Sequence, residues 1–402
     1  MANYILPLVT VPYLSRVLGA AGWGLVAIAQ SFALYGNLIV EYGFVYSGTR
    51  QIATAPTDEA KEQIVAGVLG AKLLLSLFVI GAACLAYLFI PVFREHSTLL
   101  WTAVLAEIVK ASLPNYYFYG INRVAVASAL DISARTAAAI GIFIFVHRPE
   151  DAWKVFALQG AGAGAALVVG HGMIYSRYDL RWPRMREGMR MLQEGGSMFL
   201  FRSAHNMYAL GNAFILGLFA PPQVVGYYAG AEKINSAAVG LLSPLTTALY
   251  PRAAGLAKTS MRKAARLTVF SLYAMVAVSL VLGSIMWFGS PMIVRVILGP
   301  SFSPSADVLK ILSLRAPLVA WTYVLGFQWL LSLGLEKSFR NVTVVALVLN
   351  VLLATCLAPA SGARGMAFAV VISQAAAALG IYFVLRARKL NPFVIGSDPS
   401  YA

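Results

Sequence analysis

The segment LPLVTVPYLSRVLGAAGWGLVAIAQSF, Leu6–Phe32, joins two apolar runs by a short connector. Arg16 closes the first run, and glycines follow it, beginning with Gly19. Charges and turn residues between apolar runs are typical of the boundary between two membrane helices. The segment therefore predicts one spanning helix over residues 3–18 and a second over residues 24–48.

The rest of the chain has the same apolar character. Of its 402 residues, 59% are hydrophobic and 12% are charged, whereas a soluble domain has about 25% charged residues. The mean hydropathy is +0.75. A spanning helix needs about 20 apolar residues, so the length leaves room for about a dozen spans and for no large soluble domain. The chain is therefore predicted to be an all-α integral membrane protein.

Apolar runs between turn and charge signals predict twelve spans in all. They cover residues 3–18, 24–48, 64–92, 98–120, 124–146, 152–176, 196–220, 223–250, 266–290, 305–333, 339–360 and 363–386. We expect kinks at Pro114 and Pro317, which lie inside two of these spans. The first run is short, which favours a natural start upstream of Met1.

The net charge is +15, from 31 Lys and Arg against 16 Asp and Glu. In a soluble protein this balance would suggest a nucleic-acid partner, but membrane proteins concentrate basic residues in cytoplasmic loops. Connectors after even-numbered spans, together with the C-terminal tail, hold more than twice as many basic residues as connectors after odd-numbered spans. We therefore expect both termini in the cytoplasm, a location in the bacterial inner membrane, and no nucleic-acid partner.

The sequence predicts no catalytic residues, no metal site and no cofactor. Its two cysteines, Cys84 and Cys356, lie inside apolar runs, and its four histidines lack metal-ligand spacing. Walker A, HExxH and nucleophile-elbow motifs do not occur. We expect a transport protein rather than an enzyme. Since no ATP-binding module is present, its energy would come from a coupling ion (Na⁺ or H⁺), the substrate or a partner.

The two halves of the chain repeat each other weakly. At a shift of 202 residues Gly24 falls on Gly226 and Arg50 on Arg252, and at a shift of 214 Gly120 falls on Gly334. A shift of six spans preserves orientation, so we predict two parallel, pseudo-symmetric six-helix lobes around a central cleft. The predicted domains are an N-terminal lobe at 1–176, a basic cytoplasmic linker at 177–195, a C-terminal lobe at 196–390 and a cytoplasmic tail at 391–402.

Ten charged residues lie six or more residues from either end of a predicted span, where each costs about 2.5–3.5 kcal/mol at a helix centre and normally faces a cavity or a partner. They are Lys72, Lys110, Arg135, Arg202, Lys233, Arg315, Glu41, Glu107, Asp131 and Glu232. Spacing predicts two local pairs, Glu107 with Lys110 and Asp131 with Arg135.

Three of the cations, Lys72, Arg202 and Arg315, have no acid at helical spacing, and His205 shares the helical face of Arg202. Guanidinium groups bind phosphate in a bidentate manner, and ammonium groups add a compact charge. We therefore predict a basic cleft wall for an anionic headgroup, with Lys110 as a further member. The alternative is that these side chains reach water or pair separately between helices.

Two acids, Glu41 and Asp131, are candidates for ion coupling. Glu41 has no Lys or Arg three or four residues away, and a carboxylate inside a membrane protein can exchange a proton or hold a sodium ion. A structural bond from Glu41 to Arg16 or to another cation is the alternative.

The opening region resembles a known family. Leu6–Phe32, followed by EYGFVYSGTRQIA at residues 41–53, is similar to the start of bacterial polysaccharide flippases of the Wzx type. These belong to the multidrug, oligosaccharidyl-lipid and polysaccharide exporter superfamily. The resemblance implies a flippase that moves undecaprenyl-diphosphate-linked oligosaccharide to the periplasmic leaflet by alternating access, for O-antigen or exopolysaccharide synthesis. The implied partners are that substrate, membrane lipids and polysaccharide polymerase or export machinery.

The positions that match the family pattern lie in the first fifty residues. They are Pro12, Arg16, Gly19, Gly22, Gly24, Glu41, Gly43 and Arg50. The resemblance implies that Arg16 binds the diphosphate. In the second half, Leu218 stands at the position of Arg16 and Ser243 at that of Glu41, which favours a ligand-related role for residues present only once.

Two other functions stay open. A cation-coupled drug antiporter of the multidrug-extruder type would have a cavity rich in acids. The ten intramembrane charges are six cations and four acids, which disfavours this function. A membrane polymerase or ligase of sugar chains would need a large periplasmic loop, whereas the longest predicted periplasmic connector, residues 291–304, is short.

Overall fold

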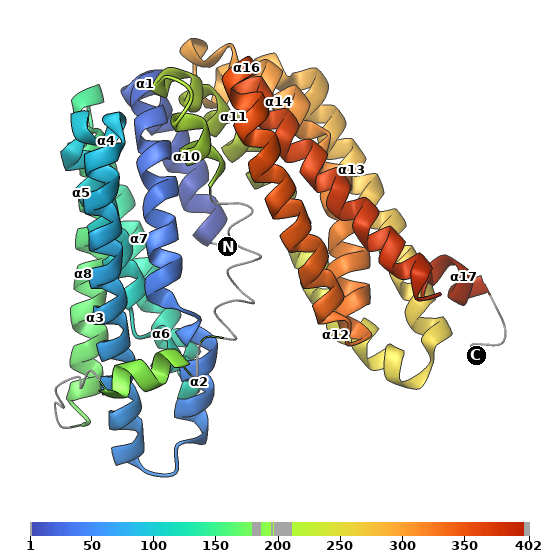
Figure 1. Cartoon of the computed structure of the whole chain (residues 1–402), viewed down its shortest axis with the longest axis horizontal. Coiled ribbons are helices and arrows are strands. Elements are labelled where there is room, and N and C mark those ends of the chain that lie inside the picture. The colour runs from blue at the N-terminus through green and yellow to red at the C-terminus, as the bar shows by residue number, and fades with distance from the viewer. Residues whose placement is uncertain (1, 179–185, 194–195, 197–210, 398–402) are drawn as a thin grey trace. The chain divides into compact units, whose positions relative to one another are not determined.

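Figure 1 shows the computed structural model, which describes residues 2–178, 186–193, 196 and 211–397. These residues form helices joined by short turns, and none of them forms a strand. Two compact units divide the chain, Met1–Phe214 (unit 1) and Ile215–Ala402 (unit 2). The predicted all-α fold is confirmed.

Unit 1 is a bundle in which α5 packs against both α1 and α8, and α7 packs against α8. Its elements are α1 (Ala2–Glu41), α2 (Phe44–Thr54), α3 (Asp58–Phe89), α4 (Pro91–Glu95), α5 (Ser97–Ser112), α6 (Asn115–Gly120), α7 (Val124–Phe145), the short η1 (Pro149–Asp151) and α8 (Ala152–Tyr175). Gly19 has φ 65° and divides α1 into two helices at the predicted connector, since glycine adopts this conformation without steric cost.

Two further breaks in unit 1 lie inside predicted spans. After α1 ends at Glu41, Tyr42 (φ 48°) and Gly43 (φ 78°) adopt left-handed conformations before α2 begins. Helix α5 ends at Ser112, and Pro114 precedes α6, because proline lacks the N–H needed to continue a helix. The kink predicted at Pro114 is therefore confirmed. The half-helices α2 and α6 pack against each other.

Unit 2 has a similar order of long and broken helices. It contains α10 (Asn212–Gly217, which crosses the unit boundary), α11 (Pro222–Gly240), α12 (Ser243–Thr259), α13 (Met261–Ile297), η2 (Pro300–Phe302), α14 (Ser305–Ser313), α15 (Arg315–Trp321), the π-helix η3 (Thr322–Leu330), α16 (Glu336–Ala387) and α17 (Pro392–Ser397). Gly362 (φ 55°) divides α16 at another predicted connector. The break near Pro317 falls at Leu314, and Pro317 lies in the first turn of α15, where proline is tolerated.

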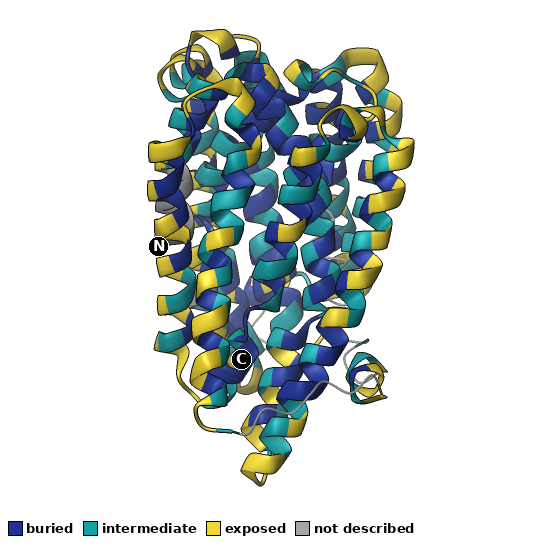
Figure 2. Cartoon of the chain, turned by 90° about the vertical axis from the view of Figure 1, so that its left-hand side faces the viewer, coloured by how far each residue is buried: buried dark blue, intermediate teal, exposed yellow. Residues whose placement is uncertain are grey.

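Seven helical segments of the described residues are long and apolar enough to cross a membrane, and two of them contain the breaks at Gly19 and Gly362. Exposed apolar side chains, such as Leu77 and Phe78 on α3, occur along these segments, and Figure 2 shows the exposed residues on one side of the chain. The described residues thus have the features of a multi-pass membrane protein. The span count of twelve, the cytoplasmic termini and the bounds of the four predicted domains stay predictions, and the span 196–220 lies largely outside the described residues.

Candidate functional site

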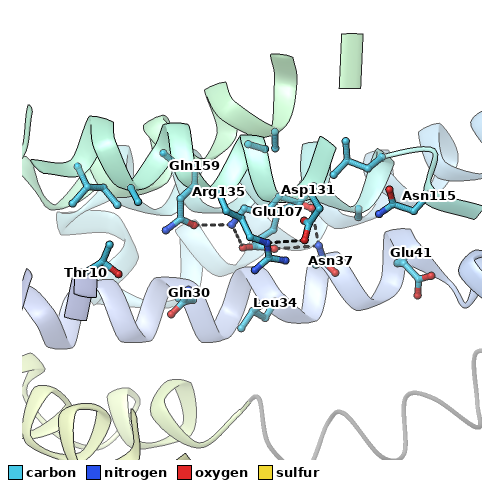
Figure 3. A pocket seen from close by; sticks show the side chains of 18 of the residues that line it. Thr10, Gln30, Leu34, Asn37, Glu41, Glu107, Asn115, Asp131, Arg135 and Gln159 are labelled. Atoms are coloured by element: carbon cyan, nitrogen blue, oxygen red, sulfur yellow. Dashed lines mark hydrogen bonds and ion pairs between the residues drawn. The ribbon is translucent and has the colours of Figure 1, made fainter. Parts of the chain in front are cut away.

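A pocket of about 560 Å³ lies inside unit 1, between α1, α5, α7 and α8 (Figure 3). Its polar lining consists of Thr10, Gln30, Asn37, Glu41, Glu107, Lys110, Asn115, Asp131, Arg135 and Gln159. The rest of the lining is aliphatic, and alanines of α5, α7 and α8 dominate it. Because ionisable groups within membrane helices are expensive, such a cluster is a functional-site hypothesis by default.

Glu107 is the centre of a hydrogen-bond network between three helices. Its side chain is 4% exposed, and its Oε1 accepts a bond of 2.7 Å from Lys110 Nζ. Asn37 Nδ2 donates to Glu107 Oε2 at 3.1 Å, and Lys110 Nζ also donates to Gln159 Oε1 at 2.6 Å. The predicted local pair is confirmed. The network neutralises the buried carboxylate, as a buried charge requires.

A second ion pair lies on α7. Arg135 Nε donates to Asp131 Oδ2 at 2.9 Å, which confirms the other predicted pair. The side chains are 50% and 30% exposed, respectively, so small ligands and water reach this pair more easily than Glu107. With Glu41, the lining holds three acids and two cations. The sequence predicted a cleft wall of unpaired cations. In this pocket both cations, Lys110 and Arg135, instead bond to acids one helical turn away.

Glu41 ends α1 and caps the next half-helix. Its two carboxylate oxygens accept bonds from Gly43 N at 3.1 Å and Val45 N at 3.0 Å, at the start of α2. A helix N-terminus favours an anion because its first N–H groups lack intrahelical partners. From the sequence, the alternative to ion coupling is a structural bond from Glu41 to a cation. Capping of α2 is a different structural role. Ion coupling through Glu41 stays a prediction.

Lys72, on α3, lies outside the pocket lining and is only 4% exposed. Its Nζ donates to Ala111 O at 2.7 Å and to Leu113 O at 3.3 Å, and it lies 5.4 Å from the centroid of the Tyr116 ring. The ammonium group therefore satisfies the carbonyls at the end of α5, where a cation also complements the helix dipole. These contacts explain a buried lysine without a bound ligand.

Among the other predicted substrate-binding residues that the structure describes, Arg16 and Arg315 do not line the pocket. Arg16 is exposed near the end of the first part of α1. Arg315 begins α15 in unit 2, and its buried Nε has no hydrogen-bond partner in the described part of the chain. Arg202 and His205 lie outside the described residues. Of the six predicted residues, Lys110 is the one that the structure places in this pocket, and the binding roles of all six stay predictions.

The motif residues lie along α1 and α2, which are interrupted at Gly19 and at Gly43. Gly19 and Gly43 have positive φ angles at the two breaks. Pro12 is half-buried and Gly24 buried within α1, whereas Arg50 is exposed on α2. The positive φ angles at Gly19 and Gly43 therefore explain why glycine occupies these two motif positions.

The model of the family described as "Polysaccharide biosynthesis protein" matches residues 1–257, which include all of unit 1 and its pocket. The chain belongs to this family. The resemblance inferred from the opening motif is therefore confirmed at the level of the family.

Two curated relatives of this chain bear the name "Putative O-antigen transporter". The one from Escherichia coli (strain K12) is 29% identical over 358 residues, which cover 88% of this chain and 86% of the relative. The one from Shigella dysenteriae is 26% identical over 394 residues, covering 96% and 97%. Both are named as transporters, in agreement with the prediction that the chain is not an enzyme.

Two solved structures show which fold the chain shares. An inward-facing multidrug resistance MATE family transporter of the MOP superfamily matches with a TM-score of 0.69 at 14% identity, covering 98% of this chain and 99% of that one. The lipid II flippase MurJ matches with a TM-score of 0.65 at 14% identity, covering 97% and 89%. The chain thus shares the fold of these two structures.

Sequence reasoning missed the amides of the pocket, Gln30, Asn37, Asn115 and Gln159. One signal was available. Asn37 stands seven residues after Gln30 and four before Glu41, so the three share one helical face in an apolar run. The convergence of Asn115 and Gln159 on that face depends on the packing of α5, α6 and α8 and has no signature in the local sequence.

Proposed function

We propose that this protein is a flippase that moves undecaprenyl-diphosphate-linked oligosaccharide from the cytoplasmic to the periplasmic leaflet of the bacterial inner membrane. The family and the names of the curated relatives support transport in polysaccharide synthesis. The polar pocket inside unit 1 is the structural observation that carries the proposal. The product would serve O-antigen or exopolysaccharide synthesis, with the polymerase or export machinery as the next partner.

The chemistry of such a substrate explains why a pocket of this kind is needed. An isoprenoid tail stays in lipid at little cost, whereas a sugar headgroup loses its hydration in the bilayer core unless polar groups replace the water. The pocket offers ten polar side chains within a bundle whose outer faces are apolar. Polar groups inside and apolar groups outside are the distribution that movement of a hydrophilic headgroup requires.

Alternating access requires a part of the bundle that moves as a body. The half-helices α2 and α6 form such a candidate. Both begin at backbone breaks, and Thr49 Oγ1 of α2 donates to Tyr116 O of α6 at 3.1 Å. A Cβ added to Gly120 would lie 2.5 Å from Ile52 Cγ2, so the two half-helices are in close contact. We propose that α2 and α6 swing together when the site changes its access.

Two roles are carried over from the sequence as proposals. The diphosphate is assigned to the predicted basic residues Arg16, Arg202 and Arg315, with His205. The two predicted candidates for the coupling ion, H⁺ or Na⁺, are Glu41 and Asp131, and of these we propose Asp131, whose carboxylate is partly exposed.

Deletion of the gene in its native host tests the proposal. We expect surface polysaccharide to be lost and the lipid-linked oligosaccharide to accumulate in the cytoplasmic leaflet, with both effects reversed by the intact gene. Normal surface polysaccharide without accumulation of the intermediate would contradict the proposal.

One observation favours a second candidate function, the cation-coupled antiporter. The pocket has one more acid than cation in its lining, as expected for a site that accepts cationic compounds. In the same deletion strain, increased sensitivity to cationic drugs with unchanged surface polysaccharide would support the antiporter.

A further inference from the structure

The polar lining of the unit 1 pocket is poorly suited to a diphosphate. Its two cations are engaged, Lys110 with Glu107 and Gln159, and Arg135 with Asp131. A diphosphate entering the pocket would therefore have to displace a carboxylate from each cation and would face three acids in total. Like charges brought together at low dielectric are strongly unfavourable.

The amides in the pocket favour a neutral ligand rich in hydroxyl groups. Each amide side chain offers both a carbonyl acceptor and two N–H donors, which matches a hydroxyl group that donates and accepts. Gln30 and Asn115 line the pocket, and neither amide has a hydrogen-bond partner among the residues that the structure describes. These two amides are therefore available to a ligand without breaking an existing bond.

The hydrogen-bond network fixes the remaining polar groups. Asn37 Nδ2 donates to both the backbone O and Oε2 of Glu107, at 3.1 Å each, and Lys110 bridges Glu107 and Gln159. A neutral ligand can add bonds to the remaining lone pairs of these groups and leave the ion pairs intact. Groups held in place before binding lose little side-chain entropy when the ligand arrives.

The size and the apolar wall fit a sugar ring. The volume of about 560 Å³ lies within the usual range of roughly 300–1,000 Å³ for small-molecule pockets. Ala134, Ala138 and Ala139 of α7 and Ala163 of α8 contribute small apolar surfaces. A pyranose ring has a rim of hydroxyl groups and faces of C–H groups, and it would meet amides at its rim and alanines at its faces.

We propose that the unit 1 pocket binds a neutral sugar residue of the oligosaccharide headgroup, and that the diphosphate binds outside this pocket. This inference rests on the proposed flippase function and names the part of the substrate that the pocket recognises. Gln30 and Asn115 are the direct contacts, and the Glu107 network positions the rest of the lining.

The test compares two lipids on the purified full-length protein in nanodiscs. One is undecaprenyl diphosphate without sugar, and the other is the lipid-linked oligosaccharide isolated from the deletion strain. Gln30→Leu and Asn115→Leu are each expected to weaken binding of the glycosylated lipid about three- to tenfold, the loss of one to two hydrogen bonds. Binding of undecaprenyl diphosphate should stay within twofold of the wild type. Gln63→Leu, the same substitution at an exposed position of α3, is the matched control and should change neither.

Three outcomes would overturn the inference. Equal losses for the two lipids would place the diphosphate in the pocket, and unchanged binding of both lipids by both variants would place the sugar elsewhere. If the wild type binds neither lipid, the proposed flippase function fails together with the inference. In the first two outcomes the wild type still binds the glycosylated lipid, so the flippase function survives and the assignment of the pocket alone is wrong.

Discussion

Units 1 and 2 have a similar order of helices but different polar groups inside them. In unit 1, two ion pairs and four amides line a pocket. In unit 2, the described side-chain bonds of buried amides join neutral groups. Asn350 Nδ2 donates to Ser373 Oγ at 3.3 Å, and Gln374 Nε2 donates to Thr322 Oγ1 at 3.1 Å. Neutral bonds of this kind hold membrane helices together, whereas the charges of unit 1 need a further reason.

The internal repeat shows which features the units share. At the shift of 214 residues, Asp131 falls on Val345 and Arg135 on Leu349. The positive φ angles at Gly19 and Gly362, in contrast, divide the first helix of unit 1 and the last long helix of unit 2 at predicted connectors. Backbone breaks thus occur in both units, while the charged pocket belongs to unit 1. The two units thus share broken helices, and the ligand pocket that we propose lies in unit 1.

The largest effect is expected from breaking the most buried ion pair of unit 1. Glu107→Leu leaves Lys110 without its carboxylate inside the bundle, and we expect the free energy of unfolding to fall by about 3–5 kcal/mol. The double variant Glu107→Leu with Lys110→Met removes both charges and should recover most of that loss. Thermal unfolding of the purified protein measures both. Equal stability of the single and double variants would show that the pair is not electrostatically coupled.

Lys72→Met is expected to have the next largest effect. It removes the ammonium donor from the carbonyls of Ala111 and Leu113 at the end of α5, and hydrogen bonds to a charged group contribute about 1.5–3 kcal/mol. Lys72→Arg keeps the charge and serves as the control. Chemical unfolding measures the stability, and lipid binding is measured on the folded protein. A selective loss of lipid binding at unchanged stability would instead support the predicted contact of Lys72 with substrate.

Substitutions at Gly19 and Gly362 test the helix breaks in α1 of unit 1 and α16 of unit 2. An alanine at either position must combine a positive φ with an extended ψ (−179° at Gly19 and −128° at Gly362), a region used almost only by glycine, which costs roughly 1–3 kcal/mol. An added Cβ meets no atom within 4 Å at Gly19 but lies 3.1 Å from Val224 Cγ1 at Gly362, so Gly362→Ala should destabilise more than Gly19→Ala. Thermal unfolding of the two variants decides the order, and the reverse order would contradict this account of the two breaks.

Glu41→Gln is expected to have the smallest effect on stability. The amide oxygen still accepts a bond from the start of α2, while the negative charge at the helix N-terminus is lost, which costs roughly 0.3–1 kcal/mol. The counterpart in unit 2 is Ser243, an uncharged residue at the start of α12. Transport at different H⁺ and Na⁺ concentrations gives a second readout. Loss of ion dependence in Glu41→Gln, but not in Asp131→Asn, would move the coupling site from Asp131 to Glu41.

Local sequence patterns predicted the features that depend on neighbours along the chain. Gly19 and Pro114 marked breaks, and the pairs at Glu107 and Asp131 followed from helical spacing. The role of Lys72 could not be predicted in this way, since its ammonium bonds carbonyls about forty residues away in the sequence. The pocket amides were missed for the same reason, because four helices must pack before they face one cavity.

We propose that the charged pocket of unit 1 serves transport rather than folding. Replacing Asp131 by Val and Arg135 by Leu gives unit 1 the residues that unit 2 has at the matching positions. Because both partners of the pair are removed together, no unpaired charge is left, and the fold should be retained. The decisive measurement is translocation of the lipid-linked oligosaccharide in proteoliposomes. We predict that the double variant loses translocation while its thermal unfolding matches the wild type, and translocation at the wild-type rate would contradict the claim.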